Sequence, residues 1–213
     1  MDLRFQVSYE KATQALNFMA TKDGGRISKL KAIKLIFLAD RYHLRKYGRP
    51  VVGDQYFAME HGPVPSVTKD LADKSRYLSD REKEYAERFI ETDDDKRLTL
   101  SSVEDVDQDV FSDSDIEALN FVWKGYGSLE QWALKNITHA YPEWQVHQAE
   151  LGAEGCQRTE MEYADFFRDP DPQDPRLSTV GYRDFFSEVI DEEQKESARE
   201  IAEEETRICS LWR

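Results

Sequence analysis

Residues 29–47, with the sequence KLKAIKLIFLADRYHLRKY, place the strongest constraint on the fold. Ser28 is positioned to cap the start of a helix here, and Gly48 is positioned to end it. Apolar side chains cover most of the circumference at helical spacing, which predicts a helix in the middle of a domain. Only a narrow basic stripe is expected to face water, and it consists of Lys31, Lys34, Arg41 and Arg45.

Asp40 interrupts the apolar surface of this helix, because it falls inside an apolar face on a helical wheel. A buried carboxylate needs hydrogen bonds or a partner charge. The candidate partners are Arg49, His61 and the backbone N–H groups of residues 48–66. In the structural interpretation, Asp40 pins that segment to the helix. In the catalytic alternative, Asp40 and His61 form an acid–base pair.

The segment after this helix, GRPVVGDQYFAMEHGPVPS at residues 48–66, predicts a rigid corner. The β-branched and aromatic content of residues 51–59 is typical of a strand. Two prolines in the next stretch disfavour helix in the residues before them, which predicts a forced turn over 61–65. Ser66 is positioned to cap the helix that follows.

Capping residues and apolar periodicity predict further helices on both sides of this corner. They span residues 9–22, 67–78, 116–127 and 128–141. Residues 85–101 predict a hairpin with FIE and RLTL as its arms and the three aspartates at 93–95 in its turn. Adjacent carboxylates diverge, so this turn predicts a solvated tip and not a metal site. The whole pattern predicts an α+β, mainly α class, a compact helical domain with a small antiparallel sheet of about three strands.

The periodicity fades over residues 148–180, where the stretch at 169–175 predicts a linker or irregular loop. Three aromatic residues just before this loop need burial, namely Tyr163, Phe166 and Phe167. The final segment predicts a helix with nine acidic and two basic residues between Glu188 and Glu205. Its sparse apolar positions are Phe185, Val189, Ile201, Ile208, Leu211 and Trp212. Such a helix either gains order against a partner or packs back on the body.

The net charge of −14 is unevenly divided along the 213 residues. Residues 1–100 hold 19 basic and 16 acidic side chains, a balance of +3, whereas residues 101–213 hold 10 and 27, a balance of −17. We expect the acidic half to attract a basic partner and to repel nucleic acid. Two alternatives stay open: the acidity serves only solubility, or the basic stripe of the 29–47 helix binds nucleic acid.

The sequence predicts a cytoplasmic protein that needs no cofactor or metal. It has no run of about 18 apolar residues, and its N-terminus lacks an apolar signal core. Cys156 and Cys209 are far apart and form no CxxC pair, which indicates free thiols in a reducing compartment. Nucleotide-binding, zinc-protease and serine-hydrolase motifs are missing. An enzyme would have to use Asp40, His43 or His61, and no motif supports that alternative.

Two groups of motifs stand out along the chain. The first group is KL at 34–35, LADR at 38–41, His43, YGRP at 47–50, YFAM at 56–59 and HGPVP at 61–65. The second group is YG at 126–127, Trp132, Leu134, TH at 138–139, Pro142 and Trp144. Together they resemble the Panacea domain, also called the SocA-like antitoxin or phage-associated GepA-like domain. We expect a Panacea domain over residues 1–147. We expect residues 148–213 to form an irregular Pro/Asp-rich linker plus an acidic C-terminal helix, packed on the same domain.

The resemblance implies an antitoxin of a bacterial or phage toxin–antitoxin system that neutralises a cognate protein toxin by direct binding, without catalysis. One family member instead hands its toxin to a cytosolic protease, so the alternative is a proteolytic adaptor or a phage-associated regulatory module. The acidic extension is either the toxin-specific element or a part that completes the fold. No helix-turn-helix accompanies the domain, so we do not expect this chain to bind its operon.

The predicted corner would present aromatic side chains in a fixed shape, which suits protein binding because little conformational entropy remains to be lost. The predicted partner-binding residues are Tyr42, Tyr56, Phe57, Met59 and His61. The predicted structural residues are Asp40, Gly48, Arg49, Pro50, Gly62 and Pro63. No residue is predicted to be catalytic or to bind a metal.

Overall fold

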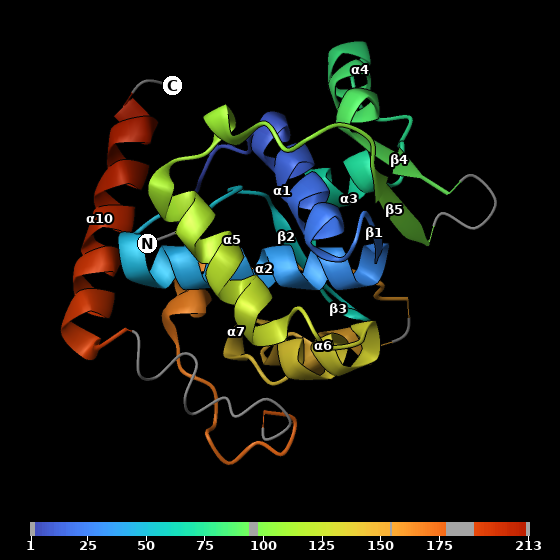
Figure 1. Ribbon diagram of the computed structural model, residues 1–213. Helices are drawn as coiled ribbons and strands as arrows, with labels where there is room; N and C mark the ends of the chain where they lie inside the picture. Colours follow the sequence, from blue (N-terminus) through green and yellow to red (C-terminus); the bar gives the residue numbers. More distant parts are fainter. Residues whose placement is uncertain (1–2, 94–97, 154, 178–189, 212–213) are drawn as a thin grey trace.

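The computed structural model describes residues 3–93, 98–153, 155–177 and 190–211, whose elements surround one central helix, α2 (Lys29–Tyr47) (Figure 1). The other helices are α1 (Tyr9–Lys22), α3 (Ser66–Ala72), α4 (Asp80–Phe89), α5 (Asp113–Tyr126), α6 (Gln131–Thr138), α7 (Pro142–Gln145), α8 (Gln148–Leu151), α10 (Glu192–Leu211) and the 3-10 turns η1 (Gln108–Val110) and η2 (Tyr163–Phe167). The strands are β1 (Arg26–Ser28), β2 (Tyr56–Met59), β3 (Gly62–Pro65), β4 (Ile90–Thr92), β5 (Thr99–Ser102) and β6 (Arg158–Glu160).

Both predicted ends of α2 are confirmed. The Ser28 hydroxyl accepts the Lys31 N–H, and Gly48 ends the helix with a φ of 77°. The expectation that one stripe of α2 faces water is wrong, because every residue from Lys31 to Arg45 is buried. The helix is therefore covered on all sides.

Distant segments supply acceptors for the basic side chains of α2, and this is why they can be buried. Their partners are Asp23 for Lys31, the Pro63 carbonyl for Lys34, Glu143 for Arg41, and the Phe166 carbonyl together with Asp169 for Arg45. A helical wheel shows only the spacing within α2, so it could not anticipate partners up to 124 residues away along the chain.

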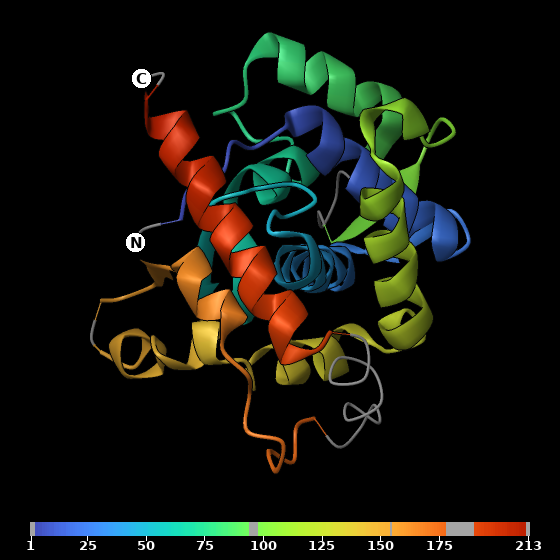
Figure 2. The ribbon, with the colours of Figure 1, turned by 90° about the vertical axis from the view of Figure 1, so that its left-hand side faces the viewer.

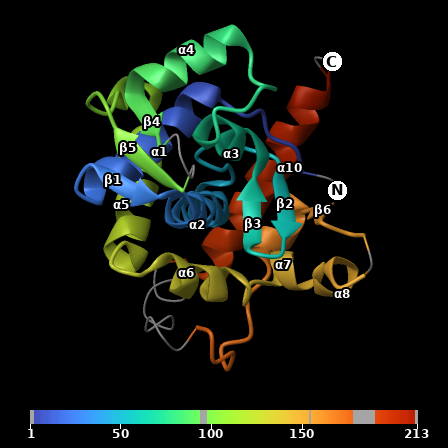
Figure 3. The ribbon, with the colours of Figure 1, turned by 90° about the vertical axis from the view of Figure 1, so that its right-hand side faces the viewer.

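The expected fold class, mainly α with a small antiparallel sheet, is confirmed, although the strands form two three-stranded sheets. Their strand orders are β1-β5-β4 and β3-β2-β6, with antiparallel pairing throughout. Figure 3 views α2 along its axis, with β4 and β5 on one side and β2 and β3 on the other. The predicted hairpin arms pair as β4 and β5, but residues 85–89 belong to α4. Residues 94 and 95 of its predicted turn lie outside the described residues.

The corner at residues 48–66 differs in detail from its prediction. The strand covers only residues 56–59, and the prolines lie in β3, not in a turn. β3 is an edge strand, where a residue without an N–H group is tolerated. Asp54 lies just before the strand, and its buried carboxylate accepts the N–H groups of Val67 and Thr68 at 3.0 and 2.7 Å. The side chain that caps α3 is therefore that of Asp54 and not that of Ser66.

Asp40 is fully buried and pins this corner to α2. Its Oδ1 accepts the Val52 N–H at 2.9 Å, and its Oδ2 accepts the Tyr56 hydroxyl at 3.0 Å. The structural interpretation, with backbone N–H groups as partners, is confirmed. Arg49 is not a partner of Asp40, because its guanidinium lies 2.9 Å from the buried carboxylate of Asp115.

The C-terminal helix α10 crosses one end of α2 (Figure 2) and packs against it through Ala198 and Ala202. Of the apolar residues predicted to form its stripe, Ile201 lies against Gly48 at the edge of this contact although it is partly exposed, and Ile208 and Leu211 are exposed. Phe185, Val189 and Trp212 lie outside the described residues. Small side chains allow the two helix backbones to approach closely.

The three aromatic residues of η2 are buried, as predicted. No helix in the described part of the chain has the length and apolar character needed to cross a membrane.

Both the backbone conformation of Gly48 and the close approach of α10 require a glycine at this position, and comparison of two substitutions distinguishes these two effects. Its φ is positive, and a Cβ there would lie 2.6 Å from the Ala198 carbonyl oxygen and 2.7 Å from the Ile201 Cβ. The φ of Gly24 is also positive, at 83°, but a Cβ on Gly24 would have open space around it. We predict that Gly48→Ala lowers the free energy of unfolding by about 2–4 kcal/mol and Gly24→Ala by about 1 kcal/mol, measured by urea denaturation. Equal losses would contradict the packing of α10 on Gly48.

The ionisation of Asp40 predicts a pH-dependent stability. Burial raises the pKa of Asp40 from 3.8 to about 7, although the Val52 and Tyr56 hydrogen bonds favour the charged form. Between these two values the folded state holds a proton that the unfolded chain has lost. Asp40 therefore lowers the free energy of unfolding as the pH rises from about 4 to 7, by up to about 1.4 kcal/mol per pH unit.

Asp40→Asn should remove this contribution. We predict that urea unfolding of the variant between pH 4 and 7 gives a stability that falls less steeply with rising pH than that of the wild type. Asp105→Asn, at an exposed aspartate, is the control and should leave the slope unchanged. Parallel pH profiles for wild type and Asp40→Asn would show that Asp40 stays ionised when buried.

Candidate functional site

An apolar groove of about 900 Å³ lies beside the N-terminal end of α2, between the β2–β3 hairpin and α6–α8. Figure 3 shows this hairpin above the three short helices. The apolar side chains that line the groove are Leu30, Ile33, Met59, Val64, Leu98, Trp132, Trp144 and Leu151. A concave apolar surface with a few polar groups is the usual form of a binding site.

The five predicted partner-binding residues do not share one surface. Tyr42 and Tyr56 are each only 1 % exposed, so they lie in the core and outside the reach of a partner. Tyr42 stacks on Phe121, and Tyr56 binds Asp40. Placing these two tyrosines at a binding surface was therefore wrong, because both belong to the packing around α2.

The other three predicted residues lie on the hairpin. Met59 and His61 line the groove. His61 is exposed at the hairpin turn, and Met59 is half-buried. Phe57 is half-buried in β2, where the Arg158 guanidinium lies 4.7 Å from the centre of its ring. Met59 and His61 thus share the groove, and Phe57 lies outside it.

Trp132 is the main groove residue that sequence reasoning missed as a binding residue. In the predicted helix at residues 128–141, Trp132 falls on the same apolar stripe as Leu129 and Ile137, which predicts a core residue, yet its side chain is 53 % exposed. The helix instead begins at Gln131, and Leu134 and Ile137 are its buried residues. The Trp132 ring meets His61 edge-to-face, with centroids 5.8 Å apart. The sequence offered one signal for its exposure: Leu134 and Ile137 already supply the core contact of this helix, so the tryptophan is not needed there.

Trp144 joins the hairpin to the far wall of the groove. Its indole N–H donates to the Met59 carbonyl at 3.1 Å, and its ring stacks on His139 with centroids 3.7 Å apart. Burial, together with the nearby Lys135, lowers the pKa of His139 to about 3. This histidine is therefore neutral at physiological pH, and it places no charge against the Trp144 ring that lines the groove.

Lys34 binds β3 of the hairpin through the backbone of that strand. Its side chain is fully buried, and its ammonium donates to the Pro63 carbonyl at 2.6 Å. Burial, and to a lesser degree the charge of Lys135, lowers the pKa of Lys34 to about 7. A Cβ on Gly62 would lie 3.2 Å from the Lys34 Cε and 2.8 Å from the Thr138 hydroxyl, so Gly62 must be small. Gly62 and Pro63 therefore act as structural residues.

The two cations at the rim of the groove share one carboxylate, and an acidic side chain lies nearby. Lys29 and Lys69 both pair with Asp73, the latter at 2.6 Å. Glu60 is exposed at the hairpin turn. The groove therefore offers an apolar surface with little net charge, which favours an apolar part of a partner over a charged ligand.

The residues of the catalytic alternative, Asp40, His43 and His61, do not lie together as an acid–base pair. Both oxygens of Asp40 bind Val52 and Tyr56, whereas His61 lies against Trp132, so these two residues form no acid–base pair. His43 is buried, and burial lowers its pKa to about 4. Its Nδ1 donates to the Arg49 carbonyl at 2.5 Å, which leaves Nε2 to accept from Ser114. Within the described residues no group of three potential ligands could hold a metal ion.

Comparison with known families agrees with the motifs around α2 and the hairpin. The model of the family described as antitoxin SocA-like, Panacea domain, matches residues 33–145, which is more than half of the chain. Searches among curated proteins and among solved structures gave no match. The matched region contains Asp40, the hairpin and Trp132, and ends just after Trp144. The chain belongs to the SocA-like antitoxin family that is defined by the Panacea domain.

Proposed function

We propose that this protein is the antitoxin of a bacterial or phage toxin–antitoxin pair, and that it neutralises a cognate protein toxin by direct binding through the apolar groove. The observation that carries the proposal is an exposed tryptophan in an apolar groove of little net charge, in a SocA-like domain. Exposed apolar surface of this kind is costly to leave in water and commonly marks an interaction site.

The groove is also well prepared for binding. Asp40 and Lys34 hold the two strands of the hairpin, and Trp144 holds its Met59 carbonyl. A partner would therefore order few groups on this side, and more of the contact energy would appear as affinity. Tryptophan is among the residue types that most often dominate binding energy at such a surface.

Co-expression tests the function directly. The product of the adjacent gene should arrest growth when expressed alone, and this chain should restore growth and co-purify with it. A harmless neighbour, or a toxic one that forms no complex with this chain, would contradict the proposal. Co-purification with a cytosolic protease, without any rescue of growth, would instead identify the protein as an adaptor.

We predict that Trp132→Ala weakens binding to the adjacent gene product by about 30-fold, because the substitution removes the most exposed aromatic contact of the groove. Calorimetry with the purified proteins measures the dissociation constant. Tyr77→Ala is the matched control, since Tyr77 is 76 % exposed and lies outside the groove. Its affinity should equal that of the wild type. Equal losses for both variants, or no loss for Trp132→Ala, would exclude the groove as the binding site.

A further inference from the structure

The outer side of α10 carries a second exposed apolar surface, at the other end of α2 from the groove. Of the eight large apolar side chains that are exposed in the described chain, three lie on this helix. Ile201, Ile208 and Leu211 are 46, 48 and 77 % exposed. Their spacing of seven and three residues places them along one side of the helix. We call these three side chains the apolar stripe of α10.

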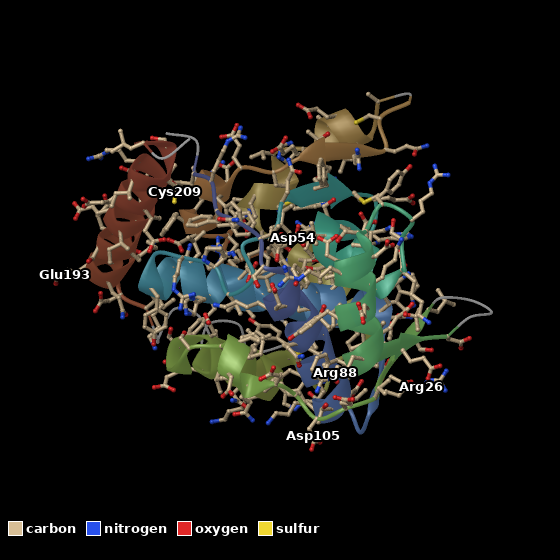
Figure 4. The ribbon with its side chains drawn as sticks, turned by 90° about the horizontal axis from the view of Figure 1, so that it is seen from above. Arg26, Asp54, Arg88, Asp105, Glu193 and Cys209 are labelled. Atoms are coloured by element: carbon tan, nitrogen blue, oxygen red, sulfur yellow. The ribbon has the colours of Figure 1, made fainter. Side chains whose placement is uncertain are left out.

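Most of this stripe faces away from the body, although Ile201 also contacts Gly48. The inner side of the helix consists of Ala198 and Ala202, which are 1 and 0 % exposed. Figure 4 shows the two sides: Glu193 points away from the molecule, whereas Cys209 lies on the side of the helix that faces it. Leaving large apolar residues outside and using alanines inside is the reverse of what packing alone would favour.

The helix is nevertheless held firmly. Lys195 lies 2.7 Å from Asp169, whose carboxylate also binds Arg45 of α2. Near the other end, the Thr206 hydroxyl accepts the Arg4 N–H at 3.3 Å. These contacts, together with the close approach at Gly48, fix the orientation of the stripe before any partner arrives.

A row of acidic side chains runs beside the stripe. Its members are Glu193, Glu196, Glu200 and Glu204, all exposed and spaced three or four residues apart. They form no ion pair within the described residues, although Glu192 and Glu203 do so with Lys195 and Arg199. Unpaired carboxylates in a row raise the local negative potential and attract cations over a distance set by the salt concentration.

The charge identifies the kind of partner that fits the stripe. A second copy of this helix would bring like charges together, which is destabilising. Nucleic acid and anionic lipid are repelled for the same reason. A protein with basic side chains around an apolar depression satisfies both the carboxylates and the stripe.

We propose that the apolar stripe and acidic row of α10 form a docking surface for a basic protein, and that this surface sets the rate of association. The proposal rests on the proposed function, since the basic protein is the cognate toxin. The acidic row steers the encounter, and the stripe retains the partner once contact is made. The acidic row of α10 therefore sets how fast the complex forms, whereas the stripe and the groove both slow its dissociation.

Charge reversal on the full chain tests the steering. The variant carries Glu196→Lys, Glu200→Lys and Glu204→Lys. The control carries Glu84→Lys, Glu87→Lys and Glu91→Lys, which are exposed on α4 and β4 and change the net charge equally. Stopped-flow mixing with the adjacent gene product at low and high salt measures the association rate. We expect a fall of at least about 10-fold at low salt for the α10 variant, with a weaker salt dependence, and less than about threefold for the control.

Polar substitution in the stripe tests retention. Ile208→Ser should raise the dissociation rate by about 5–10-fold, whereas Val103→Ser, at a residue 54 % exposed outside α10, should not change it. Circular dichroism confirms that each variant is folded. If the wild type binds but the α10 variants keep its rates and salt dependence, only the α10 surface is wrong. If the wild type forms no complex, both the proposed function and the proposed docking surface are wrong.

Discussion

The burial of α2 on all sides is the constraint on which the rest of the structure depends. A helix in that position cannot leave its ionisable groups unpaired, because an uncompensated buried charge costs about 3–5 kcal/mol. Each such group on α2 therefore fixes another segment. Asp40 holds the corner at Val52 and Tyr56, and Arg41 holds Glu143. Arg45 holds the Phe166 carbonyl of η2 and the Asp169 carboxylate just after it. Long-range order in this protein is organised by one helix.

This arrangement fixes the relative positions of the two surfaces that we propose bind the partner. α2 rises about 28 Å over its 19 residues, and the groove lies at its first turns while α10 crosses its last. Both surfaces are attached to the same buried helix, so the distance and angle between them are fixed. A partner that touches both meets a preformed shape, with apolar contact at one end and negative charge at the other.

Capping and periodicity made the local elements predictable. The ends of α2 and the start of α1 at Tyr9 depend on neighbouring residues, and the sequence places them correctly. The arms of the β4–β5 hairpin are placed to within one or two residues. The burial of Asp40 and its bond to a nearby N–H could also be anticipated, because the carboxylate interrupts an apolar face. These features depend on interactions over about a dozen residues.

Interactions across the chain were not predictable from spacing. Lys34 looks like a surface residue until the Pro63 carbonyl is brought to it, and Arg49 looks like a partner for Asp40 until Asp115 is brought closer. Trp132 has the spacing of a core residue, yet the core is already filled by Leu134 and Ile137. The groove combines residues from α2, the hairpin and three short helices, so only the folded chain defines it.

Hydrogen exchange on the free protein and on its complex with the adjacent gene product tests most directly that one preformed body binds through both ends of α2. The amides of α2 should be the slowest to exchange in either state. The account predicts that complex formation slows exchange in the β2–β3 hairpin, α6 and α10, and leaves α4 unchanged. Slowing confined to α4 and the β4–β5 hairpin, or fast exchange within α2, would contradict it.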